Sequence, residues 1–184
     1  MMSERIYLNN DWKFAEQFEA SMTEAAYDDS VMQNVRLPHT CKETPLHYFD
    51  EHCYQMVSGY RRVIEAEEAW KGKKILLTID GAAHDSEVFL NGDKVGEHHC
   101  GYTAFTMDIS GVLRYGEKNI LVVKVDSRED LNIPPFGYVI DYMTYGGIYR
   151  DVYLDIKNKD YIEDIFIRTN IGQMDDQNAE LISE

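Results

Sequence analysis

Short runs of strand-forming residues recur along this chain about every ten residues, with turn-forming residues between them. The runs Lys74–Asp80 and Asn119–Val125 are almost entirely aliphatic, as expected for strands inside a sheet. Between two apolar runs stands Asn91-Gly92, which supplies the positive backbone φ angles that a two-residue hairpin turn needs. A sustained helical period is not present in the sequence. The pattern therefore predicts an all-β fold of the β-sandwich type.

The stretch Asp141–Ile156 combines a strand pattern with a loop that is suited to a polar ligand. Its second half, from Ile148 onward, alternates apolar and polar residues apart from Arg150, and so predicts a strand with one buried face. Its first half is rich in tyrosine, contains the diglycine Gly146-Gly147 and has one carboxylate, Asp141. We therefore expect a loop that is anchored to a strand and that binds something polar.

The chain changes character beyond Lys159. A further strand is predicted between Tyr161 and Thr169, and another begins at Ala179. We therefore expect one domain over residues 1–158, and a linker with the start of a second β domain over residues 159–184. Because the last predicted strand reaches the final residue, we expect it to continue in a longer protein.

Charge and cysteine content restrict the partners and the compartment. The chain has 33 acidic and 18 basic residues, and its net charge is -15. A surface this acidic repels nucleic-acid phosphates and anionic membranes, so we expect neither as a partner. The three cysteines have no Cys-x-x-Cys spacing, and the chain has no apolar run of signal-peptide or membrane-span length. These features predict a cytoplasmic protein.

Histidines and cysteines occur in two groups but predict no cofactor and no metal. The groups are His39, His47, His52 and Cys53, and His98, His99 and Cys100. Their spacings match no compact zinc site. His84-Asp85 is not accompanied by a nucleophile motif such as Gly-x-Ser-x-Gly, so no catalytic triad is predicted.

Several motifs occur in one order along the chain. They are Trp12-x-Phe14, Leu37-Pro38-His39, Asn91-Gly92, Val95-Gly96, His98-x-x-Gly101-Tyr102-Thr103-x-Phe105, Asp108-Ile109, Gly116-x-x-Asn119, Val123-x-Val125-Asp126, and Asp141 followed by Tyr145-Gly-Gly-Ile-Tyr-Arg150-Asp151-Val. In this order they resemble the N-terminal sugar-binding domain of glycoside hydrolase family 2, which includes β-galactosidases and β-glucuronidases. The resemblance covers roughly residues 5–157.

The resemblance implies a fold and a division of labour. It implies a jelly-roll β-sandwich of the galactose-binding type, followed by an immunoglobulin-like domain and then by a (β/α)8 barrel. Family members cleave glycosides with retention, using two glutamates of the barrel about 5 Å apart. This chain lacks the barrel, so the resemblance implies a non-catalytic domain with no catalytic residues of its own. A homo-oligomer is compatible with the family.

The resemblance also suggests substrate-binding residues. In galactosidases of the family, an aspartate at the place of Asp141 reaches into the barrel's active site and holds the terminal galactose. Tyr138 and Tyr142 are candidates to stack on the sugar, whereas Tyr145 is expected to pack against protein. A second family contact, an asparagine, has only Gln55 as a counterpart. Arg150 and Asp151 are expected to form a structural pair or to lie in an interface.

Two alternatives remain open at this point. The chain is either the N-terminal domain of a β-glycosidase or a free-standing carbohydrate-binding or interaction module. Within the first alternative, the galactoside, the glucuronide and other β-glycosides all remain candidate substrates.

Overall fold

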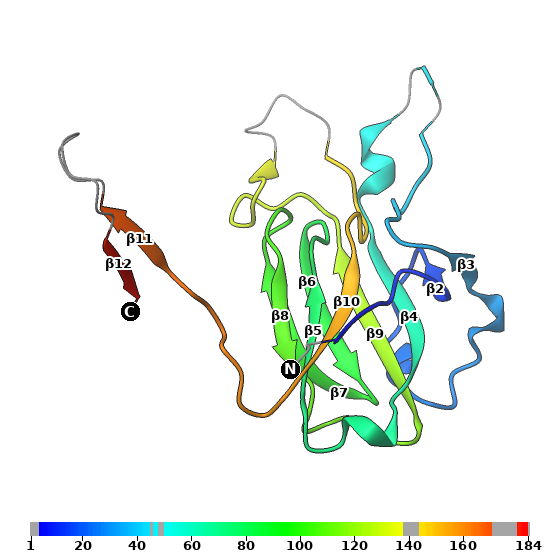
Figure 1. The fold of residues 1–184 in the computed structure, drawn as a ribbon. Coiled ribbons are helices and arrows are strands. Elements are labelled where there is room, and N and C mark those ends of the chain that lie inside the picture. Colours follow the sequence, from blue (N-terminus) through cyan, green and yellow to red (C-terminus); the bar gives the residue numbers. More distant parts are fainter. Residues whose placement is uncertain (1–3, 45, 48–49, 138–143, 171–179, 184) are drawn as a thin grey trace.

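The chain folds as a two-layer β-sandwich, seen in a computed structural model that describes residues 4–44, 46–47, 50–137, 144–170 and 180–183 (Figure 1). One sheet has four strands, in the order β1 (Glu4–Tyr7), β10 (Val152–Lys157), β5 (Lys74–Ile79) and β8 (Phe105–Asp108). The other has six, in the order β3 (Gln33–Val35), β2 (Trp12–Ala15), β4 (Val57–Glu65), β9 (Lys118–Asp126), β6 (Asp85–Leu90) and β7 (Asp93–His99). All neighbouring strands are antiparallel, which confirms the predicted all-β sandwich.

The hairpin between β6 and β7 turns where the sequence predicts. Asn91 and Gly92 have φ angles of 54° and 95°, the left-handed conformations that a turn of this kind needs. The neighbouring strand β9, predicted as central, lies between β4 and β6.

The last strand of the sandwich is shorter than predicted. The alternation suggested a strand from Ile148, but β10 begins at Val152. The side chain of Asn9 explains the delayed start, because its Oδ1 accepts from the Val152 amide at 3.0 Å and its Nδ2 donates to Asp151 at 2.8 Å. Ile148 is nevertheless fully buried, so its inward direction was predicted correctly.

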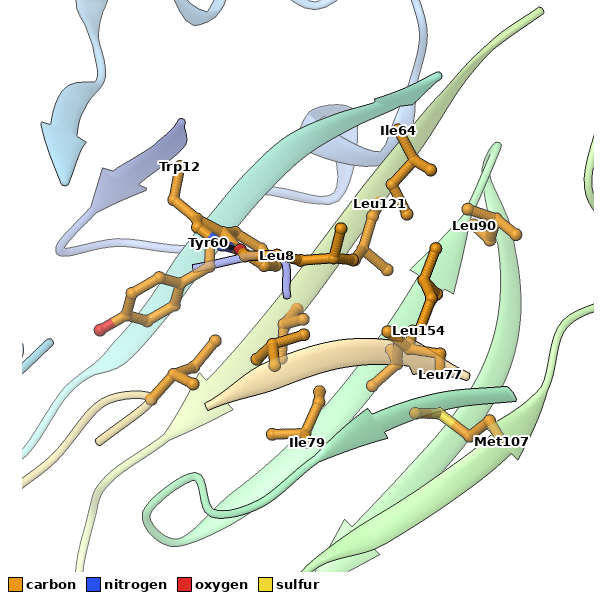
Figure 2. Close-up of a cluster of buried hydrophobic side chains, with 14 of the residues drawn as sticks. Leu8, Trp12, Tyr60, Ile64, Leu77, Ile79, Leu90, Met107, Leu121 and Leu154 are labelled. Carbon is orange, nitrogen blue, oxygen red and sulfur yellow. Dashed lines mark hydrogen bonds between the residues drawn. The ribbon is translucent and has the colours of Figure 1, made fainter. Parts of the chain in front are cut away.

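The core lies between the two sheets and is made of the inward-facing residues of the strands (Figure 2). In β10, Val152 and Leu154 are fully buried, and they face Leu121, Val123 and other side chains of the opposite sheet. Each fully buried aliphatic side chain contributes roughly 1.5–3 kcal/mol of hydrophobic free energy. This core makes the sandwich a rigid support for the loops at its ends.

A layer of short 3-10 helices covers the outer face of the six-stranded sheet. Helices η1 (Ala20–Thr23) and η2 (Asp29–Val31) are held there by Arg61 of β4. The buried Arg61 guanidinium donates to the Met22 carbonyl at 3.1 Å and forms an ion pair with Asp29. Its burial is tolerated because each of its polar groups finds an acceptor.

Beyond β10 the chain forms a separate two-stranded sheet. Strands β11 (Ile167–Asn170) and β12 (Glu180–Ser183) pair with each other in an antiparallel hairpin and with no described strand of the sandwich. Figure 1 shows this hairpin at the end of an extended connection. Ile162, Ile165 and Phe166 in that connection are 75%, 62% and 62% exposed. In the described part of the chain, no helix is both long and apolar enough to span a membrane.

Candidate functional site

The three predicted substrate contacts, Asp141, Tyr142 and Tyr138, lie outside the described residues. The structure describes the segments on both sides of them, which end at Gly137 and resume at Thr144. These flanks lie at the end of the sandwich where β4 begins and β9 ends, as the contacts of Ser127 show. Its amide donates to the Met56 carbonyl at 2.9 Å, and its side chain lies against Gly146.

The diglycine anchors one flank of this loop because the protein leaves no room for a side chain. A Cβ at Gly146 would lie 2.4 Å from the Ser127 hydroxyl oxygen and 2.7 Å from the Cys41 sulfur. A Cβ at Gly147 would lie 2.6 Å from the Tyr60 hydroxyl oxygen, and the φ angle of Gly147 is 110°. Only glycine combines this close approach with this backbone conformation without strain.

Backbone hydrogen bonds hold the same flank from two sides. On one side, the amides of His39 and Cys41 donate to the carbonyls of Ile148 and Gly146 at 2.8 and 2.9 Å. On the other side, Ala83 and Gly147 exchange hydrogen bonds of 2.9 and 3.3 Å as an isolated bridge. The backbone at 146–148 is therefore fixed between two segments that are distant in the sequence.

Fully buried Tyr60 and half-buried His39 form a polar pair beneath the diglycine. The Tyr60 hydroxyl lies 2.9 Å from His39 Nδ1, and the two rings meet edge to face with centroids 5.6 Å apart. Burial raises the pKa of Tyr60 and lowers the pKa of His39, so both side chains are uncharged at neutral pH. An uncharged hydrogen-bonded pair suits a structural support better than proton transfer.

The aromatic residues next to the diglycine are placed by packing. Tyr145 is 50% exposed, and its ring meets the Tyr54 ring edge to face at 5.2 Å, in agreement with the packing role expected for it. The Tyr149 hydroxyl donates to the Gly101 carbonyl, and the Arg150 guanidinium lies over the Tyr149 ring. Of the two roles expected for Arg150 and Asp151, the pair is not found among the described residues, where Asp151 accepts from Asn9 instead, and the interface role stays a prediction.

A hollow of about 460 Å³ opens at the same end of the sandwich and contains Gln55. Its other lining residues are Asp85, Asp126, Arg128, Glu129, Asp130 and Ile133. The volume is within the usual range for a small-molecule site. Carboxylates that accept, together with an amide that both donates and accepts, are the groups that bind sugar hydroxyls. The structure thus places Gln55, a weak candidate from the sequence, in a polar hollow near the loop.

The charges in this hollow are unevenly balanced. Arg128 pairs with Asp126 at 2.5 Å. Burial raises the pKa of Asp126, but the hydrogen bonds with Arg128 and the charges of Arg128 and Lys124 together lower it below its ordinary value, so this carboxyl stays ionised at neutral pH. Glu129 Oε2 is buried and has no hydrogen-bond partner among the described residues. Sequence reasoning missed these acids, although the cluster Asp126-Ser-Arg128-Glu129-Asp130 directly after an aliphatic strand was a usable signal.

The two groups of histidines and cysteines seen in the sequence do not form a metal centre in the described part of the chain. His98 stacks on Phe105 and lies 2.8 Å from the Thr103 hydroxyl, while His99 pairs with Asp85 at 2.7 Å. Over the described residues, no group of three or more His, Cys, Asp or Glu side chains is arranged to hold a metal ion.

His84 is a buried ionisable residue near the hollow. It is 5% exposed, and neither ring nitrogen has a hydrogen-bond partner among the described residues. Its backbone amide donates to the Asp126 carbonyl. A Cβ placed on Gly101 would lie 2.8 Å from His84 Nδ1, so the Gly101 backbone packs directly against the imidazole ring. Burial lowers the pKa of His84, and the Asp126 charge only partly opposes this.

We expect His84 to make folding sensitive to mild acid. Because its folded pKa lies below the unfolded value of about 6.5, only the unfolded chain takes up a proton as the pH falls from about 6.5 towards the folded pKa. The free energy of unfolding should therefore decrease over this interval, and it should decrease less in His84→Gln. Urea denaturation of both proteins at pH 7 and pH 5 measures the difference. Equal losses in the two proteins would contradict this role of His84, since His39 and His98 shift in the same direction in both.

Comparisons with known proteins agree with this fold and with the motif order. Glycosyl hydrolases family 2, sugar binding domain, matches residues 7–158. The chain is 40% identical over 177 residues to a β-galactosidase of Thermoanaerobacter pseudethanolicus, covering 96% of this chain and 24% of that protein. It is 34% identical over 154 residues to a β-glucuronidase of Bacteroides fragilis, covering 84% of this chain and 21% of that protein.

A solved structure shows the same fold. A calcium-binding mutant of Bacteroides uniformis β-glucuronidase 2 superposes with a TM-score of 0.80 at 32% identity, covering 91% of this chain and 20% of that one. The chain therefore spans about a quarter or less of the length of these relatives. With a match over residues 7–158 and this fold, the chain belongs to the sugar-binding domain family of glycosyl hydrolases family 2.

Proposed function

We propose that this chain is the non-catalytic N-terminal domain of a larger β-glycosidase, most similar in function to a β-galactosidase. The observation that carries the proposal is the 40% identity over 96% of this chain to a β-galactosidase of which the chain spans only 24%. In this proposal the rest of the longer protein contains a catalytic barrel, and two carboxylates of that barrel cleave the glycosidic bond with retention. This chain supplies binding and support.

The proposed contribution to substrate binding is the loop that contains Tyr138, Asp141 and Tyr142. An ionised Asp141 would accept two hydroxyl hydrogen bonds at once, and the tyrosines would pack on the C–H groups of the sugar ring. The tight anchor at Gly146 and Gly147 supports this role, because a contact that orients a substrate must itself be held in place.

The charge around the loop favours a neutral sugar over a glucuronide. The nearby hollow is lined by Asp85, Asp126, Glu129 and Asp130, and its one cation, Arg128, is already paired with Asp126. A glucuronide would bring a further carboxylate into this negative surrounding. The higher identity to the β-galactosidase than to the β-glucuronidase, 40% against 34%, agrees with this preference.

The same proposal covers the end of the chain and its setting. Residues 159–184 would form a linker and the first hairpin of an immunoglobulin-like domain, and the sandwich would end at residue 158. The exposed apolar side chains Ile165 and Phe166 are compatible with a domain that continues in a longer chain. The protein would act in the cytoplasm, and assembly into a homo-oligomer is compatible with this arrangement.

A hydrolysis assay tests the proposal. Residues 1–184 and the complete gene product are each incubated with p-nitrophenyl β-D-galactoside and with the corresponding β-D-glucuronide. We expect the complete protein to hydrolyse the galactoside with a kcat/KM about tenfold or more above that for the glucuronide, and residues 1–184 to hydrolyse neither. Hydrolysis by residues 1–184 would contradict the non-catalytic role. A complete product with no further domain and no activity would favour a free-standing carbohydrate-binding module.

A further inference from the structure

The outer face of the four-stranded sheet, on the side away from the core, is accessible. Figure 1 shows three of its strands, β10, β5 and β8, in one layer. Side chains alternate along a strand, so the pairing registers and the buried positions of the four strands define this face. Its residues are Arg5, Tyr7, Lys74, Leu76, Thr78, Thr106, Asp108, Tyr153, Asp155 and Lys157. Tyr7 is 54% exposed, and the side chains of Arg5 and Asp108 are 46% and 44% exposed, so the described residues leave much of the face open.

The charge of this face differs from that of the whole molecule. The face carries three cations, Arg5, Lys74 and Lys157, and two carboxylates, Asp108 and Asp155. The whole chain has 33 acidic against 18 basic residues and a net charge of -15. The outer face of the four-stranded sheet is therefore a nearly neutral patch on a strongly acidic molecule.

The two ends of the face differ in the sign of their charge. Lys74 of β5 lies opposite Lys157 of β10 at one end. Beyond the other end, the Asp80 amide donates to the Asp151 carbonyl, so two acidic residues are neighbours there. Burial and, after it, the charge of Asp80 raise the pKa of Tyr153, which places the Asp80 carboxylate on the same outer face. A face with one cationic and one acidic end is complementary to a second copy that lies over it in the reverse direction.

Arginine and tyrosine side chains occupy the β1 side of this face and hold one another in place. The Arg5 guanidinium donates to both Asp155 carboxylate oxygens at 2.8 and 2.9 Å and lies 3.9 Å from the centre of the Tyr153 ring. Tyr7 meets the Tyr153 ring edge to face at 5.7 Å. Tyrosine and arginine are enriched among the residues that dominate binding at protein interfaces. Because these side chains are already ordered, docking on them costs little side-chain entropy.

The charge of the molecule restricts the partner of this face. Two copies repel each other over most of their surfaces, because each has a net charge of -15. A basic partner is attracted to that acidic surface in general and gains nothing at a nearly neutral patch. A second copy, in contrast, meets the least repulsion at this patch, where the cationic end of one copy faces the acidic end of the other.

We propose that the outer face of the four-stranded sheet is a self-association surface, on which a second copy of this chain docks face to face about a two-fold axis that runs across the strands. Arg5, Tyr7 and Tyr153 anchor the contact. Four strands about 4.8 Å apart and up to six residues long cover roughly 20 by 20 Å, about 400 Å² on each copy. An interface of this size is weak and transient. The surface is independent of the loop that contains Asp141 and of the proposed hydrolase activity.

Sedimentation velocity of residues 1–184 tests the proposal at concentrations from about 10 µM to about 1 mM, in about 20 mM and about 300 mM NaCl. We expect a monomer–dimer equilibrium with a Kd on the order of 100 µM at the higher salt concentration. The dimer should be about threefold or more weaker at the lower one, because the repulsion between two acidic copies is screened less there. A chain that stays monomeric throughout, or a dimer that weakens as salt is added, would overturn the proposal.

Matched variants assign the dimer to this face. Tyr7→Glu places a carboxylate in the proposed contact, whereas Val31→Glu places one on η2, which covers the outer face of the other sheet and where Val31 is 81% exposed. Both changes lower the net charge by the same amount. Tyr7→Glu should weaken dimerisation about tenfold or more, and Val31→Glu should alter the Kd by less than about twofold. Equal effects of the two changes would refute this surface, with the unfolding midpoints recorded to show that both variants are folded.

Nuclear magnetic resonance locates the contact without any substitution. When ¹⁵N-labelled residues 1–184 are diluted over the same concentrations, we expect amide shifts in β1, β10, β5 and β8 and none in η1. Ile162, Ile165 and Phe166 in the connection beyond β10 are the competing apolar surface, because they are exposed as well. Dilution shifts confined to that connection would assign self-association to it and overturn the proposal.

Discussion

Replacing Gly147 with alanine is expected to destabilise the sandwich by about 2–5 kcal/mol. The estimate combines the left-handed backbone conformation, about 1–2 kcal/mol, with overpacking, about 1–3 kcal/mol. The new Cβ would lie 2.6 Å from the Tyr60 hydroxyl oxygen, 2.8 Å from the His39 carbonyl oxygen and 3.0 Å from the Cys41 amide. Two of these atoms belong to backbone, and Tyr60 is fully buried, so none of them can move aside easily. Urea denaturation of residues 1–184 measures the effect.

Gly111 offers the matched control for this substitution. A Cβ at Gly111 would meet nothing within 4 Å, and the residue is not in the left-handed region. Gly111→Ala should therefore leave the free energy of unfolding within about 0.5 kcal/mol of that of the parent protein. Similar losses in Gly147→Ala and Gly111→Ala would show that the close approach at the diglycine does not constrain the fold.

Replacing Asp141 with alanine in the complete protein is expected to lower kcat/KM for p-nitrophenyl β-D-galactoside by about 100-fold. The proposal gives Asp141 two charge-assisted hydrogen bonds to sugar hydroxyls, each with a net contribution of about 1.5–3 kcal/mol. The lower end of this range for both bonds, about 3 kcal/mol, corresponds to slightly more than 100-fold in kcat/KM. The measurement is steady-state kinetics, with the unfolding midpoint recorded to show that the variant is folded.

Asp93→Ala provides the control for the removal of a carboxylate. Asp93 is an exposed residue that follows the hairpin turn of β6 and β7, where Leu90 pairs with it, far from the segments that flank Asp141. It should leave kcat/KM unchanged. Unchanged kinetics in Asp141→Ala as well would remove Asp141 from the substrate site and leave the domain a purely structural role.

Local sequence patterns predicted most of the strands and one complete hairpin. Asn91 and Gly92 adopt the predicted positive φ angles, because a tight turn depends on the residues within it. The patterns failed at residues 148–151, where alternation suggested a strand. There the Asn9 side chain, far away in the sequence, takes the Val152 amide that a neighbouring strand would otherwise bind.

The candidate site was predictable only in part. The diglycine indicated an anchored loop, and the structure supplies the reason in the side chains of Ser127, Cys41 and Tyr60. The acidic cluster from Asp126 to Asp130 was visible in the sequence, but its meeting with Asp85 and Gln55, which lie in separate segments, was not. Their convergence depends on the pairing of β6 with β9, which the sequence does not specify directly.

By itself, the sequence determined the fold class, most of the strand positions and the family resemblance, because alternation and turn chemistry act over a few neighbouring residues. Only the tertiary structure decided which distant segments meet. The backbone amide of Cys41 donates to the carbonyl of Gly146, which is distant in the sequence. The Arg62 guanidinium donates to the carbonyls of Leu8 and Asn10, which hold this side chain on the inner face of β4. Such contacts are set by strand order and by the close packing of two sheets, and neither is encoded in a local pattern.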